Sequence, residues 1–144
     1  MASFTLINDW LANMVENADL ESDQFVIALS NTAPGSESTA PTGDGDGVLA
    51  NVTEVSYANC SSRDITTTSS SQTGGTYSLV LADITLTASG SVGPFRYVYV
   101  YDDTVTSPAD PLVCYYDYGS SITLANGDTL AVDFDGTNGL FQVS

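Results

Sequence analysis

Residues 94–118 read PFRYVYVYDDTVTSPADPLVCYYDY, and this stretch decides the fold. Its two runs of β-branched and aromatic residues, separated by a connection rich in Pro, Asp, Ser and Thr, predict two antiparallel strands with a long loop between them. Alternate side chains of a strand point to opposite faces of a sheet. In the first run one face carries Phe95, Tyr97, Tyr99 and Tyr101. The other face carries Arg96, Val98 and Val100, so we expect one face to line a sandwich core and the other to lie against a neighbouring protein.

The rest of the chain predicts more short strands. Alternating apolar runs, bounded by Gly, Asp, Asn and Pro, occur at 24–30, 49–57, 60–66, 77–87, 121–124, 129–135 and 139–143. Strands at this spacing are typical of a mainly β protein, an antiparallel β-sandwich or jelly roll, here as a single domain over residues 1–144. The Gly-, Ser- and Thr-rich segments 31–47 and 67–75 are expected to be exposed loops.

Within the long run 77–87, the alternation predicts one core-facing row of side chains. This row consists of Val80, Ala82, Ile84 and Leu86. The alternation over 129–135 likewise places Leu130, Val132 and Phe134 inward. Residues 1–22 differ from the rest, because their apolar residues recur at helical spacing and predict one short amphipathic helix. The apolar stripe includes Ile7, Trp10, Leu11 and Met14. Packing on the chain's own sheet is preferred for this stripe, and docking on a partner is the alternative.

Charge is the unusual feature of the composition. Eighteen acidic residues face two basic ones, Arg63 and Arg96, and the net charge is −16. Nucleic acid and anionic membranes both attract clustered Lys and Arg, so neither is expected as a partner. The absence of His removes the commonest general base, and no catalytic set is visible; an enzyme is not expected. The two cysteines, Cys60 and Cys114, lie in separate predicted strands and are expected to be free thiols in a reducing cytosol.

Asp44-Gly45-Asp46-Gly47 is the strongest metal candidate, because alternating Asp on a glycine-rich loop can supply oxygen ligands to calcium. A calcium loop of the EF-hand type would need Glu at position 55, where this chain has Val55. We therefore interpret the segment as a flexible acidic turn and predict no metal and no cofactor.

The tyrosines allow three interpretations, namely core packing, a protein interface or a carbohydrate-stacking platform. Core packing combined with a subunit interface is the preferred one. The interface candidates are Ile7, Trp10, Leu11, Met14, Phe95, Arg96, Tyr97, Tyr99, Tyr101, Tyr115, Tyr116 and Tyr118. Because the chain is so acidic, we expect Arg96 to form a bidentate salt bridge with an Asp, and Asp117 is one possible partner.

Taken in order, these segments resemble a family of small structural proteins of tailed bacteriophages. The resemblance is carried by GPFRYVYVYDDT, PLVCYYDYGSSITLANGDTLAVDFD and GLFQVS, is strongest over residues 93–144, and is looser over 23–57. It implies a virion protein synthesised in the host cytoplasm, a capsid decoration or cement protein that binds the major capsid protein. We expect a homo-oligomer, a dimer or trimer, because strands that are apolar on both sides need cover. A virion-surface or tail-associated carbohydrate-binding module is the alternative, and the extreme acidity departs from that family's usual charge.

Overall fold

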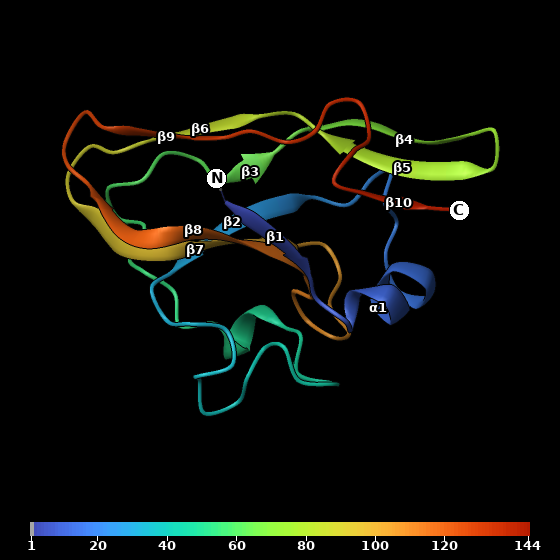
Figure 1. The fold of residues 1–144 in the computed structure, drawn as a ribbon, viewed down its shortest axis with the longest axis horizontal. Helices are drawn as coiled ribbons and strands as arrows, with labels where there is room; N and C mark the ends of the chain where they lie inside the picture. The colour runs from blue at the N-terminus through green and yellow to red at the C-terminus, as the bar shows by residue number, and fades with distance from the viewer. Residues whose placement is uncertain (1) are drawn as a thin grey trace.

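The computed structural model describes residues 2–144 and arranges the strands in two layers (Figure 1). One layer is a five-stranded sheet with the order β1-β8-β7-β2-β3. The other layer contains a three-stranded sheet, β10-β5-β4, and a two-stranded sheet, β6-β9. All the strand pairs are antiparallel, so the predicted mainly β fold with one short helix is confirmed.

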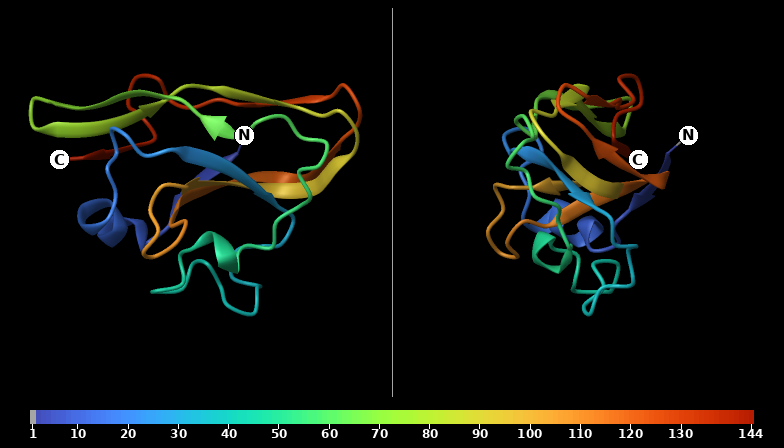
Figure 2. Two further views of the ribbon diagram at one scale, coloured as in Figure 1. Left: turned by 180° about the vertical axis from the view of Figure 1, so that it is seen from behind. Right: turned by 90° about the vertical axis from the view of Figure 1, so that its left-hand side faces the viewer.

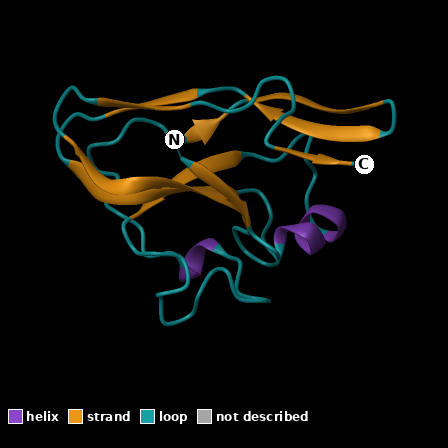
Figure 3. Cartoon of the chain, in the orientation of Figure 1, coloured by secondary structure: helices purple, strands orange, loops and turns teal. Residues whose placement is uncertain are grey.

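The helix and strands have the following bounds in chain order. They are β1 (Ser3–Leu6), α1 (Trp10–Glu16), β2 (Phe25–Ser30), β3 (Asp64–Ile65), β4 (Thr67–Thr73), β5 (Thr76–Leu81), β6 (Ile84–Thr87), β7 (Val92–Asp102), β8 (Leu112–Leu124), β9 (Thr129–Val132) and β10 (Phe141–Val143). A short 3-10 helix, η1, covers Leu49–Asn51. Figure 3 shows how few helical residues accompany the strands.

The hairpin predicted from the tyrosine-rich stretch forms the centre of the larger sheet. Tyr99 of β7 lies opposite Tyr115 of β8 on one side and opposite Ala28 of β2 on the other. The aromatic face is not continuous, however. A register irregularity between Phe95 and Tyr97 places Phe95 in the core between the layers and Tyr97 on the outer face. An extra residue in one strand reverses the facing of all that follow, which alternation alone does not reveal.

The inner face of the larger sheet packs against the second layer and helix α1. Trp10 is fully buried, with its ring centroid 6.2 Å from that of Phe25 and 6.3 Å from that of Phe141. The preferred interpretation, that the amphipathic helix packs on its own sheet, is confirmed. The helix is shorter than predicted, because Ser3–Leu6 pairs with β8 as strand β1.

The outer face of the same sheet carries the tyrosines and is covered by the chain itself. Leu49 and Val52 pack against the cluster that contains Tyr97, Tyr99 and Tyr101. The segment that holds them lies below the larger sheet in Figure 1, on the side away from the smaller layer, and Figure 2 shows the same arrangement from behind. The cover that we expected from a neighbouring protein thus comes from this chain's own connection between β2 and β3.

The run 77–87 is not one strand. It divides at Ala82 and Asp83 into β5 and β6, which belong to different sheets. Leu79 and Leu81 are the buried residues before the division and Leu86 is buried after it, so the inward-facing parity changes. The predicted core row is therefore wrong for Val80, which is half-buried, and right for Leu86.

Two weaker expectations from composition also change. Residues 67–75 are exposed for the most part, as expected, but they form strand β4 and a turn at Gly74 and Gly75, whose φ angles are 60° and 87°. The run 49–57 contains only the 3-10 helix η1 and an isolated bridge between Ser30 and Glu54. Segment 31–47 contains no helix or strand, as predicted.

Candidate functional site

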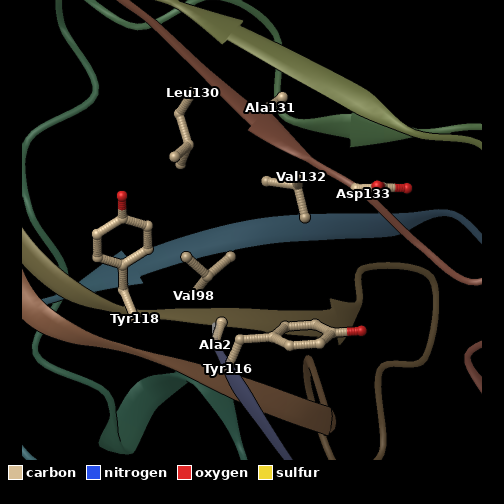
Figure 4. Close-up of a pocket in the computed structure, with 8 residues that line it drawn as sticks. All are labelled: Ala2, Val98, Tyr116, Tyr118, Leu130, Ala131, Val132 and Asp133. Atoms are coloured by element: carbon tan, nitrogen blue, oxygen red, sulfur yellow. The ribbon is translucent and has the colours of Figure 1, made fainter.

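An apolar groove lies where the two layers meet along one open side of the sandwich. It has a volume of about 300 Å³. Figure 4 shows that Leu130 and Val132 approach it from strand β9, while Val98, Tyr116 and Tyr118 approach it from the hairpin below. Ala2, Ala131 and Asp133 complete its lining.

The groove is bordered by two strands that have a neighbour on one side only. Within residues 2–144, strand β9 pairs with β6 alone, and strand β1 pairs with β8 alone. Edge strands present unpaired backbone donors and acceptors, which another extended chain can use. The site therefore combines an apolar floor with a free strand edge.

Aromatic side chains on the groove side of the larger sheet are incompletely covered. The ring of Phe4 in β1 lies 5.4 Å from that of Tyr116, centroid to centroid, and Tyr116 packs on the inner core. Phe4 is nevertheless 43% exposed, and Tyr118 is 48% exposed. Burial raises the pKa of Tyr116 above its usual range, so its hydroxyl stays protonated at neutral pH.

The predicted interface candidates divide into three groups by burial. Six are buried within the chain and unavailable to a partner in this conformation: Ile7, Trp10, Phe95, Tyr97, Tyr99 and Tyr101. Four are half-buried, namely Met14, Arg96, Tyr115 and Tyr116, and two are exposed, Leu11 and Tyr118. The groove brings together Tyr116 and Tyr118 only. The other groove residues were not among the interface candidates, although the alternation over 129–135 placed Leu130 and Val132 on an inward face.

The acidic glycine loop is organised around a carboxylate. The backbone amides of Gly45 and Gly47 donate to Asp9 Oδ1 and Oδ2 at 3.0 and 2.8 Å. A Cβ added to Gly47 would lie 2.9 Å from a methyl carbon of Ile7, so only glycine fits this close approach. The amides of this loop thus point inward at an anion, the opposite of the oxygen-lined concavity that calcium requires.

Both basic residues have acceptors within the chain. Arg96 Nε and Nη2 donate to the two carboxylate oxygens of Asp117 at 2.7 and 2.9 Å, which confirms the bidentate salt bridge. Arg63 Nη1 donates to the carbonyl of Ile27 at 2.5 Å, and its guanidinium lies 3.7 Å from the centre of the Tyr57 ring. The described surface therefore offers no arginine that lacks a partner in the same chain.

A buried carboxyl pair lies at the end of β7. Asp102 is completely buried, and its Oδ1 accepts the backbone amides of Thr104 and Val105 at 3.0 and 3.3 Å. Its Oδ2 is buried without a hydrogen-bond donor, and the neighbouring Asp23 carboxyl is buried as well. Burial, together with Asp23, raises the pKa of Asp102 to about 7. The Asp102 carboxyl therefore keeps its proton over much of the acidic range.

The structure of residues 2–144 also bears on the cysteines, on metal binding and on membrane-spanning helices. Cys60 and Cys114 are free thiols, as predicted, and burial raises both their pKa values. Within the described residues, no group of three or more Cys, Asp or Glu side chains is placed to hold a metal ion. None of the helices in this part of the chain has the length and apolar character needed to cross a bilayer.

Comparison of the chain with protein-family models, with curated proteins and with solved structures finds no match. The candidate site is therefore judged from its own geometry and charge.

Proposed function

We propose that this chain is a structural protein of a tailed-phage virion, a capsid decoration or cement protein that works through protein–protein contacts. Its partner in this proposal is the major capsid protein, and its location is the virion. The segments that resemble such proteins, over residues 93–144, form the central hairpin and the strands that follow it. The observation that carries the proposal is the apolar groove between two free strand edges on a strongly acidic molecule.

The structure changes the reason for expecting a dimer or trimer. We expected self-association because the hairpin is apolar on both faces, but Leu49 and Val52 cover the outer face within one chain. In addition, two copies of a chain with a net charge of −16 repel each other. The homo-oligomer stays a prediction, and analytical ultracentrifugation measures it.

Adding the protein back to capsid shells tests the proposal. Purified protein is incubated with shells of the phage that encodes it, and the shells are sedimented and imaged by cryo-electron microscopy. We expect saturable binding at symmetry-related positions and slower loss of intact shells on heating, because each small contact is multiplied by the symmetry. Protein that stays in the supernatant at every concentration would refute the proposed role.

A carbohydrate-binding module is the second candidate, and the exposed ring of Tyr118 beside Tyr116 is the observation that favours it. Sugars stack on accessible aromatic faces, and the fully buried Tyr99 cannot offer one. A glycan array probed with the wild type and with Tyr118→Ala separates the two functions. Saturable glycan binding that is lost in the variant would favour the module over the cement protein.

A further inference from the structure

We propose that the groove beside β9 receives an extended, basic polypeptide segment of another protein, which adds a strand to the free edge of β9 and inserts an apolar side chain beside Tyr118. This inference names the contact surface for the protein–protein role proposed above, and it rests on that role only for the identity of the partner. Extended segments that add to a sheet edge take their affinity from backbone hydrogen bonds and their specificity from alternate side-chain pockets.

The backbone of β9 shows which of its groups are already paired. Before the strand, the carbonyl of Asp128 accepts from the amide of Ala88 at 2.9 Å, on the β6 side. After it, the amide of Phe134 donates to Asp83 Oδ1 at 2.8 Å, again on the β6 side. In an antiparallel pair, residues alternate between facing the partner strand and facing away from it. The backbone amides and carbonyls of the even-numbered residues in this segment therefore point toward β6.

It follows that the amides and carbonyls of Ala131 and Asp133 point away from β6. No other strand pairs with β9 in the described chain, so these groups face the open side of the sandwich. Both residues are exposed, and both line the groove. An incoming extended segment can pair with them without displacing any existing bond of the sheet.

The two layers differ in width, and this difference leaves room for the added strand. The larger sheet has five strands, whereas β6 and β9 form a sheet of two. Phe4 and Tyr118 belong to the edge half of the larger sheet, and they are 43% and 48% exposed. Large aromatic rings that face the space between two layers are normally covered. A strand added beside β9 would lie over them and remove that apolar surface from water.

Charge decides between a second copy of this chain and a different protein. Asp133 lies on the rim of the groove, and the whole chain has eighteen acids and two arginines. Arg63 and Arg96 are both engaged within the chain, so a second copy would bring negative charge to a negative rim. A segment carrying Lys or Arg is attracted to the same rim, and attraction of this kind raises the association rate.

Synthetic peptides test this proposal directly. The probe is a ten-residue peptide that alternates Lys with Val and has one central Leu, titrated into the full chain at about 0.15 M salt, where distant charges are screened. We expect one saturable site by calorimetry, with NMR amide shifts centred on Ala131 and Asp133. The same peptide with N-methylated alternate amides cannot pair with a strand edge, and a peptide with Glu in place of Lys has the wrong charge; neither should bind.

Three variants assign the binding to the groove. Tyr118→Ala removes the exposed ring, Asp133→Lys reverses the rim charge, and Ala131→Pro deletes the outward amide at a position where an edge strand tolerates proline. Each should weaken binding by about tenfold or more, as expected for loss of roughly 1.4 kcal/mol. Leu11→Ala is the matched control, because Leu11 is 55% exposed and lies on α1 outside the groove; it should bind like the wild type.

Several results would overturn the proposal. Equal binding of the N-methylated peptide would rule out strand addition, and equal binding of the Glu peptide would rule out a basic partner. Self-association abolished by Tyr118→Ala would make a second copy the occupant. Shells that bind wild type and Tyr118→Ala equally would refute the groove and leave the capsid role standing. Peptide binding at the groove with no shell binding would refute the capsid role and leave the groove as a binding site.

Discussion

The two faces of the five-stranded sheet are covered in different ways. The inner face packs against a second β layer and against Trp10 of α1. The outer face, which carries Tyr97, Tyr99 and Tyr101, is covered by one irregular segment through Leu49 and Val52. The first cover is built from regular strands with their own hydrogen-bond ladders, whereas the second is a connection that polar contacts hold in place.

These polar contacts are individual hydrogen bonds and isolated bridges, not a continuous ladder. Asp9 accepts two amides of the glycine loop, and the carbonyl of Gly47 accepts the amide of Leu112 at 2.9 Å. The outer face also keeps the hydroxyl of Tyr99 buried without a partner, and a buried group of this kind costs stability. We therefore expect the inner face to contribute most of the global stability and the outer face to depend on individual hydrogen-bonded anchors.

The largest effect is expected from the inner face. Trp10→Ala should lower the free energy of unfolding by about 3 to 5 kcal/mol, because it removes a fully buried ring and leaves a cavity. Denaturant unfolding measures the change. Val15→Ala, at a position of the same helix that is 79% exposed, should change it by less than about 0.5 kcal/mol. Similar losses for the two variants would contradict the importance of the inner face.

The next effect concerns the buried carboxyl at the end of β7. Burial raises the pKa of Asp102 from 3.8 to about 7, so between these values the folded chain binds a proton that the unfolded chain releases. Stability should therefore fall as the pH rises from about 4 to about 7.5, by on the order of 4 kcal/mol for this group. Urea unfolding at several pH values measures the slope.

Asp102→Asn is the control for that slope, because an amide does not titrate. Repulsion within a chain of net charge −16 also grows with pH and remains in the variant. The difference between the two slopes isolates the carboxyl. Parallel profiles for wild type and variant would show that Asp102 is charged in the folded chain.

A smaller effect is expected at the anchor of the outer cover. Asp9→Ala should cost about 2 kcal/mol, because the amides of Gly45 and Gly47 lose their charged acceptor. The loop over residues 31–47 should also become sensitive to limited proteolysis. Asp44→Ala, in the same loop but exposed, should leave both properties unchanged. A loop that stays resistant in Asp9→Ala would show that apolar contacts alone hold the cover.

The smallest effect is expected at the ion pair between Arg96 and Asp117, because both side chains are partly exposed, at 38% and 27%. Such pairs contribute little to stability. The hydrogen bonds from Arg96 lower the pKa of Asp117, so the contribution is present at neutral pH and is lost as the pH falls through that lowered value. In Arg96→Gln the NMR-measured pKa of Asp117 should rise while the thermal midpoint barely changes. A large drop in the thermal midpoint would show instead that the ion pair contributes substantially to the stability of the hairpin.

Some of this architecture is readable from the sequence and some is not. The strands of the hairpin follow from alternation of aromatic and β-branched residues, and the pairing of Arg96 follows from the scarcity of positive charge. The opposite facing of Phe95 and Tyr97 does not, because a bulge adds a residue without leaving a mark in the composition. The parity change between Leu81 and Leu86 was hidden as well, because nothing in the run marks the break at Ala82 and Asp83.

The candidate site was predictable only in part. Tyr118 is an interface candidate from its place on the hairpin, and Val132 was placed on an inward face by alternation. The groove between them exists because the layer of β9 has fewer strands than the layer of β8. Sheet width depends on which distant segments pair, and local patterns do not encode it. Likewise, nothing local indicates that Leu49 and Val52 return to cover the tyrosines.

Strand β2 has a consequence for how this molecule opens. All six of its residues are buried, and it lies inside the larger sheet between β7 and β3. The β2 amides that pair with β7 can meet deuterium only when the whole sheet separates, whereas those of the exposed strand β4 can do so through local fraying. The exchange times of the β2 amides that pair with β7 thus report global unfolding, and the release of any peripheral segment can be timed against them in the same sample.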